Sequence, residues 1–309
     1  MNPKTRLAKS VAQRVANRGR ELRLTRNDAL VAYAIDRLLH RLGRSAHAPD
    51  FFLKGGVLVA NFVASPHRFT RDIDLLRRHG AARPDDLREM FRSVASVAAE
   101  DGITFIPSSI RASIARRDVD GYDGIRVTVG ATLADATITV PIDIGFGDAV
   151  VPPADRVRLN GFLEEMPQAE VFAYDVGLVI AEKVETLLAR FPLIEHRLKD
   201  LLDVVVLARS RSFEGPGLLA SLVATFRRRS TPFDLRTLDE LRDELRGRRW
   251  QEQWAVMRRE KAVVIEIDLT AVLAAFDVFV RPLLVAIHHG DSPGRWSAGG
   301  PWTRESIGR

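Results

Sequence analysis

The 309-residue sequence has no cysteine, which excludes disulfide bonds, thiolate nucleophiles and cysteine-ligated zinc or iron–sulfur sites. It also has no uninterrupted run of about 18 apolar residues, so we expect no transmembrane helix. The N-terminal residues alternate basic and small apolar types without a continuous apolar core, which argues against a secretory signal. These absences favour a cytoplasmic protein with no membrane partner.

Lysine is scarce as well, since only six of the 46 basic residues are lysine. The chain nevertheless has a net charge of +6, which makes an anionic partner the expected one, with nucleic acid first among the candidates. Hydrophobic residues make up 46% of the chain and charged residues 28%, which is the composition of a folded globular protein rather than a disordered one.

Hydrophobic periodicity divides the chain into a mixed first half and a helical second half. Helices are predicted within 4–45, where Thr25 and Asn27–Asp28 offer an N-cap, and over 56–64 and 84–100; strands are predicted over 69–76, 103–106, 125–133 and 137–144. Helices follow at 175–190, 197–209, 217–228, 236–246, 249–257 and 268–288. We therefore expect an α+β fold with an α/β domain over 1–155, a helical domain over 156–290 and a flexible tail over 291–309, with the default site in a cleft between the domains.

Two acidic residues stand out in the strand predicted over 69–76. Asp72 and Asp74 are two positions apart, so a strand places both side chains on one face, while Ile73 and Leu75 point to the core. Two carboxylates at this spacing can hold a divalent cation, and Mg²⁺ typically sits between one or two carboxylates and substrate phosphates. The alternative is a solvated polar strand face, although aspartate is a poor strand former.

A diglycine precedes this strand. Gly55 and Gly56 follow Lys54 at the expected start of a helix, where backbone N–H groups are unpaired and glycine lets a phosphate approach the main chain. A glycine pair alone mostly marks a turn. Together with the two aspartates, it predicts a phosphate-binding loop beside a metal site.

Asp143 is a third candidate acid, because it is flanked by apolar residues in the strand predicted over 137–144. If this strand pairs beside 69–76, Asp143 completes a carboxylate triad that acts on the attacking hydroxyl or on the metal. A structural interpretation, in which the acid meets an arginine, is equally open.

The helical half adds one lysine and two acids. Lys183 lies in the apolar stripe of the helix predicted over 175–190, and burial of a lysine requires an anion such as a nucleotide phosphate, unless its amine reaches past the core edge. Asp200 and Asp203 share one face of the next helix. We expect them to orient Lys183 or the substrate, although acids near a helix N-terminus also compensate its dipole.

Other chemistries find no support. The histidines lack zinc-ligand spacing, and neither a Walker loop nor a dinucleotide-binding glycine motif is present. The basic clusters Arg227–Arg229 and Arg246–Arg249, which lie beside aromatic residues, suit an RNA backbone but are more often solvated helix ends.

These motifs, taken together, resemble those of the AbiEii/AbiGii-type nucleotidyltransferase toxins, which include the MenT-type toxins of bacterial toxin–antitoxin systems. The likeness extends from about residue 7 to about residue 260 and rests on four segments in matching order: Lys54–Gly55–Gly56, Arg68-x-Thr70-x-Asp72-Ile73-Asp74-Leu75, Ala181–Glu182–Lys183 and Arg197-x-Lys199-Asp200-x-x-Asp203. Thr70 stands where a serine is common, a change that keeps the hydroxyl, and Asp143 matches the superfamily's third acid only loosely.

The resemblance implies a DNA polymerase β-like nucleotidyltransferase fold with a helical C-terminal domain. It implies Mg²⁺ held by Asp72 and Asp74, and nucleotide phosphates held by Gly55–Gly56, the segment from Arg68 to Thr70 and Lys183, with Lys54 beside them. Asp203 matches the last acidic motif, and Asp200 is its close competitor. Members of the family add nucleotides to tRNA 3′ ends and are neutralised by an antitoxin.

We therefore expect an enzyme that transfers a nucleoside monophosphate from a nucleoside triphosphate (NTP) to an acceptor hydroxyl on RNA, with Mg²⁺ as cofactor and an antitoxin as partner. One alternative is a nucleotidyltransferase that acts on a protein or a small molecule, and another is a non-catalytic domain that binds RNA or a partner. Labelled NTPs incubated with tRNA separate the acceptors, and Asp72→Ala separates an enzyme from a binding protein.

Overall fold

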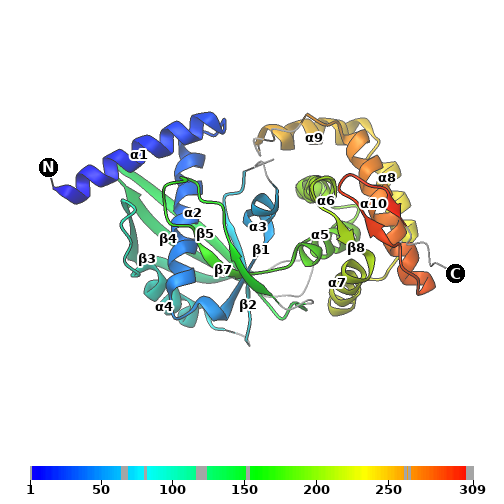
Figure 1. Cartoon of the computed structure of the whole chain (residues 1–309), viewed down its shortest axis with the longest axis horizontal. Helices are drawn as coiled ribbons and strands as arrows, with labels where there is room; N and C mark the ends of the chain where they lie inside the picture. Colours follow the sequence, from blue (N-terminus) through cyan, green and yellow to red (C-terminus); the bar gives the residue numbers. More distant parts are fainter. Residues whose placement is uncertain are drawn as a thin grey trace. The chain divides into compact units, whose positions relative to one another are not determined.

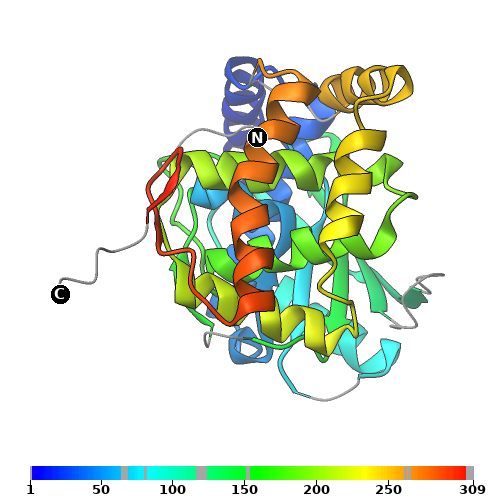
Figure 2. The same cartoon turned by 90° about the vertical axis from the view of Figure 1, so that its right-hand side faces the viewer.

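The computed structural model describes residues 2–63, 69–79, 82–115, 124–150, 154–260, 263 and 266–303. The chain separates into two compact units. The first comprises Met1–Asn61, Phe69–Asp148 and Ala154–Tyr174, and the second comprises Phe62–Arg68, Ala149–Pro153 and Asp175–Arg309. Figures 1 and 2 show the elements of each unit.

The first unit is built on a mixed sheet of seven strands in the order β3-β4-β5-β2-β1-β7-β6. The strands are β1 (Phe51–Lys54), β2 (Ile73–Arg77), β3 (Ile103–Ala115), β4 (Gly124–Leu133), β5 (Ala136–Phe146), β6 (Asp155–Arg158) and β7 (Glu170–Ala173). β2 runs parallel to β5 and antiparallel to β1, whereas β1 is parallel to β7. The central strands β5, β2 and β1 therefore bring together segments that are far apart in the sequence.

Four helices accompany this sheet: α1 (Pro3–Glu21), α2 (Arg26–Arg44), α3 (Gly55–Phe62) and α4 (Pro84–Ala95). Helix α2 packs against β5 and β7 and contacts α1 and α4, as its position in front of the strands in Figure 1 shows. Thr25 caps α2, because its hydroxyl accepts a hydrogen bond from the Asp28 amide, as expected for a residue at this position. The buried face of α2, with Tyr33, Leu38 and Leu39, forms much of the core.

Several strand limits differ from those expected, for local reasons. β3 continues to Ala115 because a register shift between Ile106 and Arg111 interrupts its alternation, and Ser109 Oγ bridges the irregularity by donating to Ile106 O (2.6 Å) and accepting from Gly130 N (2.9 Å). β6 was not expected, since it is an edge strand with exposed polar residues and has no apolar alternation. Its partner β7 has only four residues. Both strands place residues 154–174 in the first unit, although we expected the first domain to end at 155.

The second unit is mainly helical. It contains α5 (Val176–Arg190), α6 (Leu198–Ser210), α7 (Gly215–Arg228), α8 (Leu235–Glu244), α9 (Arg248–Glu260) and α10 (Leu269–His289). Helix α5 packs on α6 and α7, and α10 packs on α6, α7 and α8 (Figure 2). Three two-residue strands, β8 (Phe213–Glu214), β9 (Arg295–Trp296) and β10 (Trp302–Thr303), form a small sheet beside these helices.

The segment that follows α10 is tied to the second unit by two tryptophans. Trp296 is buried, and its indole N–H donates to Ala208 O (2.6 Å), while the indole N–H of Trp302 donates to Phe279 O (2.9 Å). We expected a flexible tail over 291–309. The structure gives 291–303 fixed partners because the apolar indole rings pack on Phe279, and 304–309 lie outside the described residues.

Helix α10 is, among the described helices, the one that is long and apolar enough to cross a membrane by length and composition. Such a helix is weak evidence for a membrane span, because the core helix of a folded domain has the same features. The buried residues of α10 pack within the second unit, and its Arg281 donates to Asp277 (2.6 Å) and to Asp239 (2.6 Å). The contacts are those of a core helix.

Candidate active site

The two acids predicted to bind a metal lie at the start of β2. Asp72 directly precedes the strand and Asp74 is its second residue; both are partly buried, and Ile73 between them is fully buried. The alternation of a strand therefore turns the two carboxylates away from the core. The hydroxyl of Thr70 donates to Asp72 Oδ1 (2.7 Å), which orients one of them.

An arginine between these residues fixes the segment to α2. Arg71 Nε donates to Asp28 Oδ1 (2.8 Å), and the hydroxyl of Thr25 donates to Asp28 Oδ2 (2.8 Å). The N-cap of α2 and the segment before β2 thus share one carboxylate. This contact explains why β2 begins at Ile73, whereas we expected the strand to start at residue 69.

Gly55, at the junction of β1 and α3, lies directly against Asp74. Its φ of +68° is in the left-handed region that favours glycine. A Cβ atom built at Gly55 would overlap the Asp74 carboxylate, so glycine is required here for a close approach of side chain to backbone. Gly56 is buried in the first turn of α3. Gly55 is therefore placed beside Asp74.

Strand register extends the site across four strands. The Cα partners are Lys54 with Asp74, Asp74 with Asp143, and Asp143 with Arg126. Partners in register present their side chains to the same face of a sheet, so these four residues form one row, which we call the charge row. Asp143 is therefore beside Asp74, as expected if its strand pairs with β2.

Asp143 is held by Arg126, which sequence reasoning did not single out. Arg126 Nε and Nη2 each donate to one oxygen of the Asp143 carboxylate at 2.7 Å. Hydrogen bonding and attraction from Asp143 raise the pKa of Arg126 above its ordinary value, and the charges of Asp72 and Asp74 add to this effect. Arg126 therefore lies in the field of all three acids. The alternation of β4 places Arg126 on the same face of the sheet as Asp143. This alternation is the sequence signal that could have identified Arg126.

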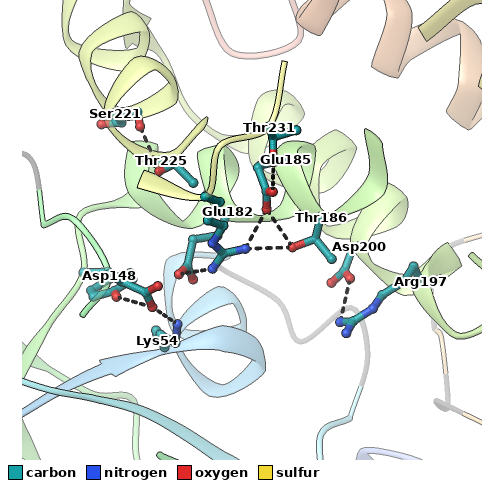
Figure 3. Close-up of polar contacts among 12 residues, drawn as sticks. Lys54, Asp148, Glu182, Glu185, Thr186, Arg197, Asp200, Ser221, Thr225 and Thr231 are labelled. Atoms are coloured by element: carbon teal, nitrogen blue, oxygen red, sulfur yellow. Dashed lines mark hydrogen bonds and ion pairs between the residues drawn. The ribbon is translucent and has the colours of Figure 1, made fainter. Parts of the chain in front are cut away.

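Lys54, at the other end of the charge row, pairs with a further acid. Its Nζ lies 2.5 Å from Asp148 Oδ2, and the hydroxyl of Tyr174 donates to the same oxygen (3.3 Å), as Figure 3 shows for Lys54 and Asp148. The Nζ atom also lies 5.5 Å from the centre of the Tyr174 ring. Asp148 and Tyr174 were not predicted, because neither belongs to a motif.

The donor set at the start of β2 fits a magnesium ion. Within the described part of the chain, no three carboxylate or histidine side chains form a group that could hold a metal ion. Asp72 and Asp74 provide oxygen donors on either side of the buried Ile73. Mg²⁺ binds through one or two carboxylates, with water and substrate phosphates as its other ligands, so two carboxylates are sufficient.

The second unit holds the other predicted residues. Lys183 on α5 is buried, and its Nζ lies 2.7 Å from Asp200 Oδ1 and 2.7 Å from Asp203 Oδ2, both on α6. The anions that a buried lysine requires are therefore present within the protein, and its amine does not extend past the core edge. Asp200 and Asp203 contact Lys183 as expected.

Nearby charged side chains shift the pKa of the Asp200 carboxyl. Burial acts to raise the pKa of the Asp200 carboxyl, but attraction from Lys183 and Lys199 outweighs it, so the pKa lies below its ordinary value. Arg197 adds to this attraction, with its Nη1 atom 3.4 Å from Asp200 Oδ2 (Figure 3). The Asp200 carboxyl is thus ionised at neutral pH.

Some arginines of the basic clusters suggested for RNA contact acids. Arg229 Nη1 donates to Glu185 Oε2 (2.6 Å) and Nη2 to Glu182 Oε1 (2.9 Å), and Glu185 also accepts from Thr231, as Figure 3 shows for the acids. In the second cluster, Arg249 Nη2 donates to Glu195 (2.6 Å). These arginines have internal partners that weaken the case for a basic RNA surface. Arg68 lies outside the described residues.

Comparison with known proteins follows this geometry. The family model for "Nucleotidyl transferase AbiEii toxin, Type IV TA system" matches residues 37–277. No curated protein sequence matches the chain. The structure is similar to that of MenT4, a nucleotidyltransferase toxin of Mycobacterium tuberculosis H37Rv, with a TM-score of 0.53, 17% identity, and coverage of 92% of this chain and 99% of that one.

Two further structures are more distant. JHP933 from Helicobacter pylori has a TM-score of 0.44 and 16% identity over 82% of this chain and 90% of its own. An antigenic nucleotidyltransferase-like protein from Paracoccidioides brasiliensis has a TM-score of 0.41 and 14% identity over 79% and 92%. The family match covers well over half of the chain and includes both acidic motifs, and the MenT4 likeness supports the same fold. The chain therefore belongs to the AbiEii family of nucleotidyl transferase toxins.

Proposed function

We propose that this toxin transfers a nucleoside monophosphate from an NTP to the 3′ end of tRNA in a Mg²⁺-dependent reaction, and that a cognate antitoxin neutralises it. The observation that carries the proposal is the position of Asp72 and Asp74 on either side of the buried Ile73 at the start of β2, with Gly55 against Asp74 and Asp143 in register beside it. This arrangement joins two hard oxygen donors to the start of a helix, where the first backbone amides have no intrahelical acceptor.

The reaction forms a bond between the acceptor oxygen and the α-phosphorus and breaks the bond from that phosphorus to the β-phosphate oxygen. Pyrophosphate leaves, and the acceptor hydroxyl loses its proton. When bound, Mg²⁺ would supply charge neutralisation at the phosphates and a lower pKa for the acceptor hydroxyl. The residues that would hold the ion are Asp72 and Asp74.

The chain's own groups orient these carboxylates and the substrate. Thr70 holds Asp72 through its hydroxyl, and Gly55 leaves room for the Asp74 carboxylate. The first amides of α3, at Gly55 and Gly56, are suited to a phosphate because they lack intrahelical acceptors. Lys54 and the segment that includes Arg68 are proposed to bind the nucleotide as well, on the strength of their place in the motifs.

Lys183, Asp200 and Asp203 are proposed to serve the same reaction because they match the third and fourth segments of the family resemblance. Asp200 and Asp203 keep Lys183 charged, since two carboxylates within hydrogen-bond distance favour the ammonium form. In this proposal Lys183 stabilises negative charge on the phosphates, and the two acids position its amine.

The proposals of an RNA acceptor, an antitoxin partner and a cytoplasmic location rest on composition and family membership rather than on the geometry of the site. The positive net charge of +6 is compatible with RNA, and family membership in type IV toxin–antitoxin systems supports an antitoxin. The absence of cysteine is compatible with a reducing compartment, and we propose the cytoplasm.

The test is a transfer assay with each α-labelled NTP, Mg²⁺ and total tRNA, using wild type, Asp72→Ala and Asp74→Ala. We expect wild type to label RNA, and each variant to lose at least about a hundredfold in rate because a metal ligand is removed. Asp135→Ala is the control, since Asp135 is an exposed acid at the β4–β5 turn. Chelation with EDTA should abolish labelling, and added Mg²⁺ should restore it.

Three results would contradict the proposal. Labelled protein or a labelled small molecule in place of RNA would show a different acceptor. Full activity of Asp72→Ala would remove Asp72 from the metal site. Growth arrest by Asp72→Ala equal to that by wild type would show that toxicity comes from binding rather than transfer.

A further inference from the structure

The charge row contains an arginine that the proposed reaction has not used. Arg126 lies beside Asp143, which is next to Asp74, and its side chain is 52% exposed while that of Asp143 is 15% exposed. An exposed guanidinium held by a partly buried carboxylate is fixed at one edge and open at the other. Arg126 is thus a cation in a defined orientation beside the acids.

The hydrogen bonds define which edge is open. The pair with Asp143 uses Nε–H and one Nη2–H, at 2.7 Å each. Among the described residues, none accepts a hydrogen bond from the Nη1 amino group. A guanidinium has parallel N–H groups on this second edge as well, and their spacing matches two oxygens of a phosphate.

From this geometry we propose that Arg126 binds a phosphate group of a substrate through its Nη1 edge, and that Asp143 positions it by holding the opposite edge. The inference deepens the proposed function and rests on it for the identity of the substrate. The phosphate belongs either to the NTP or to the RNA acceptor, which have the same binding chemistry.

The charges around Arg126 make this binding depend on a divalent ion. With Asp148, which pairs with Lys54, the acids Asp72, Asp74 and Asp143 outnumber the two cations Arg126 and Lys54 by two negative charges. The charges of Asp72 and Asp74 act on Arg126. A phosphate alone is repelled by these carboxylates. Mg²⁺ would remove this repulsion, so Arg126 should contribute to phosphate binding chiefly when Mg²⁺ is present.

The test is calorimetric titration of the full chain with two probes, each with and without Mg²⁺: inorganic tripolyphosphate for the nucleotide and deacylated total tRNA for the acceptor. Arg126→Lys keeps the positive charge but loses the paired N–H groups of the guanidinium. We expect this variant to bind one of the two probes about tenfold or more weakly than wild type does. Loss with tripolyphosphate identifies an NTP phosphate, and loss with tRNA identifies an RNA phosphate.

The same sheet provides a matched control. Arg158 on β6 donates through Nε (3.0 Å) and Nη2 (2.8 Å) to Glu170, its register partner on β7, and thus forms a cross-strand pair outside the charge row. Arg158→Lys should leave both affinities unchanged. Asp143→Asn should weaken the same arm as Arg126→Lys, and Asp143→Glu should restore part of the affinity, which a purely structural role would not predict.

Unchanged binding of both probes by Arg126→Lys and by Arg126→Ala would overturn the inference, as would equal loss in Arg158→Lys. The double variant Arg126→Ala/Asp143→Asn removes both charges of the pair and so leaves neither one unpaired. Weaker binding by this variant would therefore not result from misfolding caused by an unpaired charge. A wild type that transfers nucleotide while the Arg126 variants bind normally would defeat this inference alone. A wild type that binds through Arg126 but transfers nothing would defeat the proposed function alone.

Discussion

At the scale of single residues, the contact between Gly55 and Asp74 is the most restrictive feature of the candidate site. The backbone of Gly55 is left-handed, and the space where a side chain would begin is filled by a carboxylate. Two independent requirements therefore fall on one position. Neither depends on which substrate binds.

Gly55→Ala should destabilise the protein by about 1–3 kcal/mol, because alanine is strained at positive φ and its Cβ displaces Asp74. Transfer activity should fall further than the folded fraction does, since the displaced carboxylate is a proposed metal ligand. Urea unfolding and the labelling assay measure the two effects.

Gly217→Ala is the control, because a Cβ there meets nothing within 4 Å and alanine favours α7, in whose first turn Gly217 lies. Stability unchanged or raised is expected for it. A Gly55→Ala protein as stable and active as wild type would show that the close approach to Asp74 is dispensable.

Asp200 links ionisation to stability. Its folded pKa lies below its unfolded value of about 3.9, so it stabilises the fold above pH of about 4 and this contribution is lost as the pH falls through the folded pKa. Asp200→Asn should cost about 3 kcal/mol at pH 7, because it removes one buried partner of Lys183.

The difference in unfolding free energy between wild type and Asp200→Asn should shrink as the pH is lowered from 5 towards 3. Denaturant titrations at several pH values measure it, with Asp135→Asn as the exposed control. A difference that stays constant over this range, or grows at low pH, would show that the charge of Asp200 does not stabilise the fold.

At the scale of elements, the small sheet of β8, β9 and β10 is held by aromatic packing rather than by strand length. Trp296 lies 4.8 Å from Phe279 and 5.5 Å from Trp302 between ring centres. Strands of two residues cannot provide much hydrogen bonding. The indole of Trp296 is therefore the expected anchor of the segment after α10.

Trp296→Ala should lower the unfolding free energy by about 3–5 kcal/mol, as for other buried large aromatics. Val278→Ala on α10, at a side chain that is 52% exposed, should change it by less than about 0.5 kcal/mol. Chemical denaturation, followed by far-ultraviolet circular dichroism so that the signal does not depend on tryptophan, measures the unfolding free energy of both variants. Equal stabilities of Trp296→Ala and wild type would mean that the segment contributes nothing to the fold.

The long periodic helices and the alternating strands of the first unit were predictable from the sequence, and so was the spacing of Asp72, Asp74 and the diglycine. Register was not predictable, since it depends on pairing between segments distant in the chain. For this reason Arg126 and Asp148, which acquire their importance from neighbours across strands, were missed. The sequence around Trp296 is rich in Gly, Pro and Ser, and for this reason a flexible tail was predicted there.

At the scale of the whole molecule, part of the arginine content is paired with acidic side chains. Arg229, Arg249 and Arg281 each contact acidic side chains within the second unit. Net charge alone therefore overstates the capacity for RNA. The composition predicted an anionic partner, but which arginines are open to it follows only from the fold.

The close fit of Gly55 and Asp74 has a consequence for how such chains can change over time. A larger residue at position 55 becomes tolerable only after the carboxylate at position 74 has gone, and its loss removes a proposed ligand first. Loss of Asp74 leaves the left-handed backbone as the remaining restriction on position 55, whereas relatives that carry out the proposed reaction are expected to retain both residues. The presence of both Gly55 and Asp74 in a related sequence is therefore the sequence feature that we expect in relatives with transfer activity.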